Sequence, residues 1–103
     1  LRADRIVIAV GSAPNRPALF PFWHNRVHDS DELLYLTQMP RSLAVIGAGV
    51  IGSEYACMFA TRGTRVHLID GRDQLLPFLD PDLSAALAAA MARQGVVFHW
   101  GQK

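Results

Sequence analysis

Three glycines in the segment GAGVIG, Gly47, Gly49 and Gly52, have the spacing G-x-G-x-x-G. In dinucleotide-binding proteins the first such glycine permits a tight turn, the second lets a pyrophosphate approach the backbone, and the third lets a helix pack close to a sheet. The free amides and the positive end of that helix then face the phosphates. The segment therefore predicts a dinucleotide site with these candidate contacts: Gly47, Ala48, Gly49, Val50, Ile51 and Gly52.

An acid and a base follow in the segment HLIDGRD. Asp70 follows the glycine motif at close to the spacing, about 20 residues, that is typical of an acid that binds the adenosine ribose. Its carboxylate can accept hydrogen bonds from ribose hydroxyls, and it would repel the 2′-phosphate of NADP. Arg72 could pair with that phosphate, or the two residues could form a simple surface ion pair. We interpret the pattern as an NAD site that tolerates NADP.

Other titratable side chains give weaker indications. Glu54 lies on the first turn of the expected helix, where it could complement the helix dipole or face the nucleotide. His24 and His28 lie in a proline-rich stretch without a cysteine or acid to complete a ligand set, so we expect no metal site. Cys57 is expected to be a small core residue rather than a redox thiol.

The elements that must position these residues begin at residue 41. The pattern predicts a buried strand at 42–46, further strands at 65–69 and 96–100, a helix at about 50–62, and a second helix that starts at Asp80-Pro81 and ends at Gly95. In the first helix Ile51, Tyr55, Met58 and Phe59 should share the packing side. The order β-α-β-α-β implies an α/β fold with a Rossmann-like parallel sheet. In the usual strand order, strand 42–46 would be an open edge.

The first forty residues have a different pattern. Residues 5–10 (RIVIAV) are apolar and β-branched, which predicts a buried strand, and the prolines that follow exclude regular structure. Asp29 and Glu32 have the spacing of a capping box before a short helix in ELLYL.

Composition narrows the class of protein. The chain has 103 residues, half of them apolar, and a net charge of +1, which favours a globular protein and no nucleic-acid partner. A single cysteine fits a reducing compartment, and the longest apolar run, residues 43–51, is too short to span a membrane. We therefore expect a cytoplasmic protein. The absence of an initiator Met and the strand at the end suggest a piece of a longer chain.

Four segments carry a resemblance to a known family: RIVIAVGSAPNRP, VHDSDELLYLTQMPRSLAVIGAGVIGSEYA, VHLIDGRDQLLPFLD and GVVF. Together they resemble the pyridine nucleotide–disulfide oxidoreductase family of flavoproteins, whose FAD-binding domain carries an inserted NAD(P)-binding domain and is followed by a dimerisation domain. The resemblance implies that residues 1–40 are a strand and connecting segment of the FAD-binding domain, with Gly11 near the flavin nucleotide. Residues 41–103 would be the first half of the NAD(P)-binding domain. The expected partners are the rest of the protein's own domains and a second copy, as a homodimer or higher oligomer.

The resemblance also implies a reaction. Hydride would pass from a reduced nicotinamide to FAD and then to an oxidised nicotinamide, and GSEYACMFA and RDQLLPFLD most resemble the transhydrogenase branch. Glu54 would lie near the nicotinamide, and Val50 stands where some relatives carry a tyrosine over the flavin. Dihydrolipoamide dehydrogenase or another disulfide reductase, with a cysteine pair outside these residues, is one alternative. A non-catalytic NAD-sensing module is the other, and this chain alone should be inactive.

Overall fold

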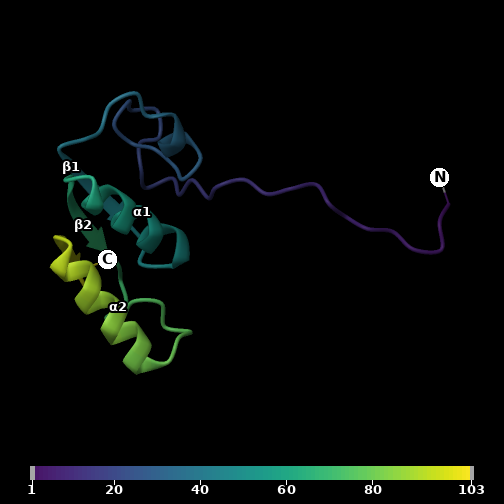
Figure 1. Ribbon diagram of the computed structural model, residues 1–103. Helices are drawn as coiled ribbons and strands as arrows, with labels where there is room; N and C mark the ends of the chain where they lie inside the picture. The colour runs from purple at the N-terminus through teal and green to yellow at the C-terminus, as the bar shows by residue number, and fades with distance from the viewer. Residues whose placement is uncertain (1, 103) are drawn as a thin grey trace. The chain divides into compact units, whose positions relative to one another are not determined.

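The computed structural model describes residues 2–102, which divide into one unit up to Thr37 and a second from Gln38 onward. The second unit contains β1 (Ser42–Ile46), α1 (Val50–Thr61), β2 (Arg65–Ile69), α2 (Pro81–Arg93) and β3 (Val96–His99), in that order (Figure 1). All strand pairs are parallel, and the strand order is β1-β2-β3. The predicted α/β class and its β-α-β-α-β order are therefore confirmed.

One face of the sheet carries the core of this unit. Val66 on β2 lies opposite Leu43 on β1 and Val96 on β3. Along β1 and β2 every second residue is more buried than its neighbours, and Val66 and Val96 are buried. Helix α1 packs on β1 and β2, and α2 packs on β3. The largest fully buried side chains are Leu68, Leu75, Met91 and Val66.

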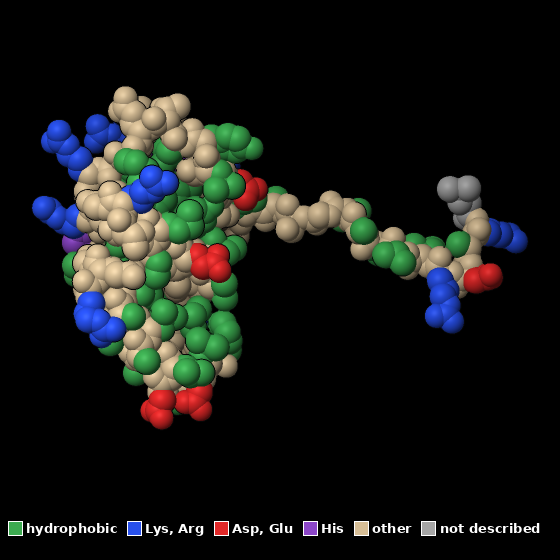
Figure 2. Space-filling view, viewed as in Figure 1, with side chains coloured by type: hydrophobic (Ala, Val, Ile, Leu, Met, Phe, Trp, Pro, Cys, Tyr) green, Lys and Arg blue, Asp and Glu red, His purple; other side chains and the backbone are tan. Residues whose placement is uncertain are grey.

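Strand β1 is not the buried strand that its apolar sequence predicts. Its residues alternate between exposed and half-buried, and Ile46 is 55% exposed. The reason is its place at the edge of the sheet, because among the described residues only β2 pairs with it and no helix covers its second face. Apolar side chains accordingly reach the surface of the molecule (Figure 2).

The packing side of α1 also differs from the expectation. Its buried residues are Ser53, Ala56, Phe59 and Ala60. Of the predicted packing residues Phe59 is buried, whereas Ile51 and Met58 are more than half exposed, at 57% and 56%. Three of the four buried side chains are small, and the helix approaches the preceding turn closely at Gly52, whereas Ile51 and Met58 turn outward.

Helix α2 begins as its cap residues predict. The side chain of Asp80 accepts a hydrogen bond from the amide of Asp82, and Pro81 occupies the first helical position. The helix ends at Arg93, two residues before the predicted stop at Gly95. Its buried residues are Ser84 and Met91.

The predicted strand at residues 5–10 does not form. The segment runs as extended chain, and Ile6, Val7, Ile8 and Val10 are at least 80% exposed (Figures 1 and 2). A strand requires a hydrogen-bonded neighbour, and no other segment within residues 2–102 pairs with this one.

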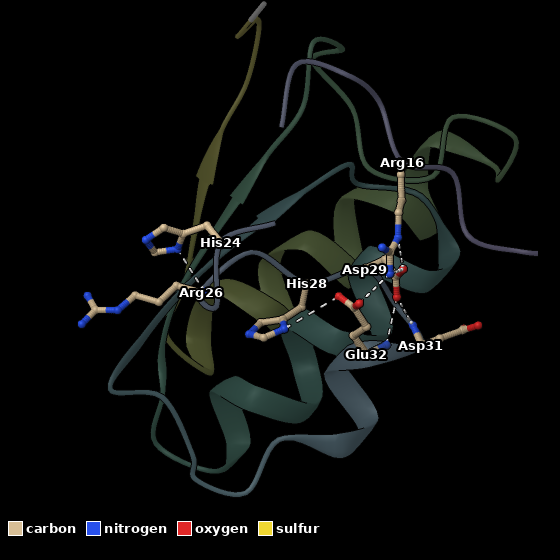
Figure 3. A network of polar contacts seen from close by, with 7 residues as sticks. All are labelled: Arg16, His24, Arg26, His28, Asp29, Asp31 and Glu32. Carbon is tan, nitrogen blue, oxygen red and sulfur yellow. Dashed lines mark hydrogen bonds and ion pairs between the residues drawn. The ribbon is translucent and has the colours of Figure 1, made fainter. Parts of the chain in front are cut away.

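The connecting segment is held together by Asp29 (Figure 3). Its Oδ1 accepts the amides of Asp31 and Glu32, both at 2.9 Å, while its Oδ2 accepts Nε of Arg16 at 2.7 Å. The bond from the Glu32 amide, with those from Arg16 and Asp31, holds the pKa of the Asp29 carboxyl below its usual range despite burial. The capping box therefore forms only in part, since the Glu32 carboxylate pairs with Arg16. The helix that follows, η1 (Glu32–Tyr35), is a short 3₁₀ helix.

Candidate functional site

The residues with dinucleotide-binding spacing meet at the carboxyl edge of the sheet. The glycine turn follows β1 and leads into α1, and Asp70 follows β2. The strand hydrogen bonds continue into this region, since the Gly47 amide donates to Ile69 O at 2.8 Å and the Asp70 amide donates to His99 O at 3.0 Å. The site therefore lies where ligands bind in open parallel α/β sheets.

Two glycines of the turn have structural reasons to be glycine. Gly47 has a φ of +104°, a backbone conformation that residues other than glycine rarely adopt. A Cβ at Gly52 would lie 1.9 Å from the carbonyl oxygen of Gly47 and 3.4 Å from a side-chain carbon of Val45. The first turn of α1 can therefore rest on the glycine turn only without a side chain at Gly52.

The third glycine, Gly49, faces open space. It precedes α1 with an extended backbone, and a Cβ there would meet no atom within 4 Å. Within residues 2–102, no oxygen accepts a hydrogen bond from the amides of Val50, Ile51 or Gly52, as expected for the first turn of a helix. Val50 and Ile51 are 49% and 57% exposed. The turn therefore offers accessible donors and the positive end of a helix to an anion.

Asp70 is a buried carboxylate with four donors. Its Oδ1 accepts the amide of Arg72 at 2.8 Å and Nε of Arg72 at 2.9 Å. Its Oδ2 accepts the amide of Ala48 at 2.6 Å and a terminal guanidinium nitrogen of Arg72 at 2.7 Å. The Arg72 side chain, followed by the Arg72 and Ala48 amides, holds the pKa of Asp70 far below its usual range, although burial opposes this. The same ion pair raises the pKa of Arg72.

The bond between Asp70 and Ala48 was not indicated by the sequence. Ala48 is completely buried, its amide is used by Asp70, and its carbonyl accepts the Leu76 amide at 3.3 Å. The loop after β2 therefore holds the glycine turn from two directions. Only the register between β1 and β2 brings these groups together, and spacing along the chain carries no signal of it.

The sequence also singled out Glu54, Gly11 and Cys57. Glu54 is exposed on α1 and lies just beyond its first turn, on which it was expected, and no described side chain or amide engages its carboxylate. Gly11, with a φ of +76°, belongs to the first unit. Cys57 is half-buried in α1, and burial raises the pKa of its thiol. Across residues 2–102 no group of three or more His, Cys, Asp or Glu side chains could hold a metal ion, and no helix there is long and apolar enough to cross a membrane.

A glycine turn at the carboxyl edge of a parallel β-α-β-α-β sheet, with an acid after the second strand, defines an α/β unit of the Rossmann type. The family model for pyridine nucleotide-disulphide oxidoreductases matches residues 1–103. The chain therefore belongs to the pyridine nucleotide–disulphide oxidoreductase family, as its sequence segments indicated.

Curated relatives match the chain over its whole length. It is 50% identical to the soluble pyridine nucleotide transhydrogenase of Pseudomonas savastanoi pv. phaseolicola and 48% identical to that of Yersinia enterocolitica, each over 103 residues. Those residues are 22% of the length of either relative, so the chain spans about a fifth of each.

Solved structures share the fold. The water-forming NADH oxidase of Lactobacillus brevis, bound to NADH, matches 90% of this chain and 22% of its own with a TM-score of 0.73 and 29% identity. The HOCl-induced flavoprotein disulfide reductase of Escherichia coli matches 70% of this chain and 16% of its own with a TM-score of 0.67 and 33% identity. Both are similar to this chain in its Rossmann-type fold.

Proposed function

We propose that this chain supplies the NAD(P)-binding part of a flavoprotein oxidoreductase that transfers hydride between NADPH and NAD through FAD. The observation that carries the nucleotide site is the turn at Gly49, where accessible amides and a helix N-terminus lie at the carboxyl edge of the sheet beside Asp70. The 50% identity with a soluble pyridine nucleotide transhydrogenase supports the transhydrogenase branch.

The residues of the turn fit a bound dinucleotide. The amides of Val50, Ile51 and Gly52 donate to the pyrophosphate, and the open space at Gly49 admits it. Gly47 and Gly52 shape the turn, and Ala48 holds it through Asp70 without touching the ligand itself. When both cofactors are bound, the nicotinamide and the flavin supply the hydride chemistry, and the protein supplies binding and orientation.

Asp70 and Arg72 face the adenosine ribose in this proposal. Asp70 accepts from its hydroxyls, which favours NAD, and Arg72 provides a cation for the 2′-phosphate of NADP. A transhydrogenase must accept both nucleotides in turn, and the adjacent acid and base serve that need.

Three further residues take the roles that the family resemblance implies. Glu54, exposed and unpaired among the described side chains, lies near the nicotinamide. Val50 leaves open the face where a tyrosine stands in some relatives. Gly11 belongs to a segment, residues 1–40, that completes the FAD-binding domain. The full-length protein is then a cytoplasmic homodimer or higher oligomer.

The disulfide-reductase alternative keeps one specific support, the 33% identity with a flavoprotein disulfide reductase. The two reactions differ in their acceptor, because a disulfide reductase passes electrons to a cysteine pair and a transhydrogenase passes them to a second nucleotide. The one cysteine of this chain, Cys57, lies in the middle of α1 without a second thiol.

The test is a hydride-transfer assay on the full-length protein, with NADPH as donor and thionicotinamide-NAD⁺ as acceptor. We expect turnover with this acceptor and none with lipoamide. Gly49→Val, which fills the open space over the amides, should abolish both nucleotide binding and turnover, and Arg62→Ala at the far end of α1 should change neither. Turnover only with lipoamide or another disulfide would replace the proposal with the reductase alternative. Failure of the wild-type protein to bind either nucleotide would overturn the nucleotide site itself.

A further inference from the structure

The Asp70 carboxylate has no acceptor position left for a ligand. An ionised carboxylate offers about four lone-pair directions, and Asp70 receives four hydrogen bonds at 2.6–2.9 Å. It is only 9% exposed, so water does not supply further freedom. A ribose hydroxyl can therefore bond to Asp70 only after one present donor leaves.

Of these donors, only the guanidinium of Arg72 can leave. The amides of Ala48 and Arg72 belong to backbone that is fixed by further bonds, from the Leu76 amide to Ala48 O and from the Gly101 amide to Arg72 O at 3.2 Å. The Arg72 side chain is 49% exposed, and within residues 2–102 its hydrogen bonds and its ion pair go to Asp70 alone. When the guanidinium turns into solvent, Asp70 keeps its two bonds from the amides of Ala48 and Arg72 but loses its described cation, and an incoming ligand must offset that loss.

We infer that Arg72 is an internal competitor for the ribose position and thereby sets the preference between NAD and NADP. An unphosphorylated ribose must displace the guanidinium from Asp70 and loses binding energy in doing so. A 2′-phosphate instead draws the guanidinium toward itself and gains a charge-assisted bond. One side chain thus weakens binding of one nucleotide and strengthens binding of the other. This inference rests on the proposed function, since it requires the ribose to lie at Asp70.

The geometry predicts opposite effects of a single substitution. Replacing Arg72 with alanine removes two of the four hydrogen bonds to Asp70, which leaves two acceptor directions free for the ribose hydroxyls. The same change removes the cation beside the 2′-phosphate and exposes the phosphate to the Asp70 charge. A conventional phosphate-binding arginine would affect only the phosphorylated ligand, so the effect on the unphosphorylated ligand is the distinguishing measurement.

The experiment is calorimetric titration of the full-length protein with ADP-ribose and 2′-phospho-ADP-ribose, which cannot reduce a flavin. We expect Arg72→Ala to bind ADP-ribose more tightly, by about threefold or more, and 2′-phospho-ADP-ribose more weakly, by about tenfold or more. The matched control is Arg62→Ala. It also removes one positive charge, but at the end of α1 that lies away from the glycine turn, and it should leave both affinities unchanged.

The outcomes separate this inference from the function on which it rests. Unchanged or weaker ADP-ribose binding by Arg72→Ala would overturn the competition while leaving the nucleotide site in place. Equal changes in Arg62→Ala would show a general charge effect and would also overturn it. Lack of binding by the wild-type protein, or binding that survives Gly49→Val, would overturn the proposed site. Dissociation constants that move in opposite directions for the two ligands in Arg72→Ala alone support the inference.

Discussion

Gly52 rests directly on the carbonyl group of Gly47, the residue that begins the same turn. A Cβ added at Gly52 would lie 1.9 Å from that oxygen and 3.1 Å from the carbonyl carbon. The contact is with backbone, which cannot rotate away as the end of a side chain could. The close approach of α1 to the end of β1, and with it the placement of the helix amides, therefore depends on this one residue.

We expect Gly52→Ala to lower the free energy of unfolding by about 1–3 kcal/mol, because the first turn of α1 must move to relieve the overlap. The matched control is Gly49→Ala, whose Cβ would meet no atom within 4 Å and whose φ of −82° suits any residue. It should lose no more than about 1 kcal/mol, as for a helix cap changed from glycine to alanine. Urea unfolding of the chain, followed by far-ultraviolet circular dichroism, measures both changes. Equal losses would show that the contact at Gly52 is not special.

The sequence predicted those parts of the fold that depend on local patterns. The start of α2 follows from Asp80 and Pro81, whose cap chemistry is complete within three residues. The bounds of β2 likewise follow from the short segment RVHLI, in which Val66 and Leu68 alternate with polar residues, between a glycine turn and an acid. Residues 5–10 have an equally clear pattern, but a strand also needs a partner, and none pairs with it in the described part of the chain.

The sequence predicted that Gly47, Gly49, Gly52 and Asp70 lie at one edge of the sheet, and the structure places them there. It did not predict the hydrogen bonds that join them. The bond from the Ala48 amide to Asp70 depends on how far the turn after β1 reaches across β2. Such a relation is set by tertiary packing, and no local pattern contains it.

Asp70→Asn should destabilise the chain in a pH-dependent manner. The folded-state pKa of Asp70 lies below its unfolded value, so its ionised form stabilises the protein fully above the unfolded pKa of about 4, and this stabilisation is lost as the pH falls toward the folded pKa. At pH 7 we expect a loss of about 1–3 kcal/mol from weakened bonds to Arg72 and to the Ala48 amide. Urea unfolding at pH 7 and pH 3 should show the difference between wild type and variant shrinking at the lower pH. A difference that stays constant would contradict an ionised Asp70 as its source.

Asp29 should control the stability of the connecting segment. Asp29→Ala removes the acceptor for the backbone amides of Asp31 and Glu32 and for the side chain of Arg16. The two amides should therefore exchange hydrogen about tenfold faster. Asp31→Ala is the control, because Asp31 is an exposed aspartate whose side chain makes no cap bond. Hydrogen exchange followed by mass spectrometry of peptides covering η1 measures the effect. Similar acceleration in both variants would assign it to loss of charge rather than to the cap.

The open edge of β1 should make the isolated chain self-associate. No described strand pairs with β1 on the side away from β2, so backbone amides and carbonyls of β1 lack a strand partner there. Ala44 and Ile46 on the same strand are exposed. Size-exclusion chromatography should show an apparent mass that rises with protein concentration. Ala44→Lys places a charge on the exposed face and should reduce this rise. A monomer at all concentrations, with no effect of the substitution, would show that the edge is protected.

Cys57 should behave as a packing residue. Its thiol is half-buried in α1 and burial raises its pKa, so a smaller fraction is thiolate near neutral pH than in a free cysteine. Because the thiolate is the reactive form, we expect reaction with Ellman's reagent at pH 8 to be about tenfold slower than for free cysteine. Reaction at the full rate in urea is the control that the thiol is intact and that folding protects it. Cys57→Ala should leave nucleotide binding by the full-length protein unchanged. Rapid reaction of the folded chain, or loss of binding in this variant, would instead indicate a thiol with a role at the site.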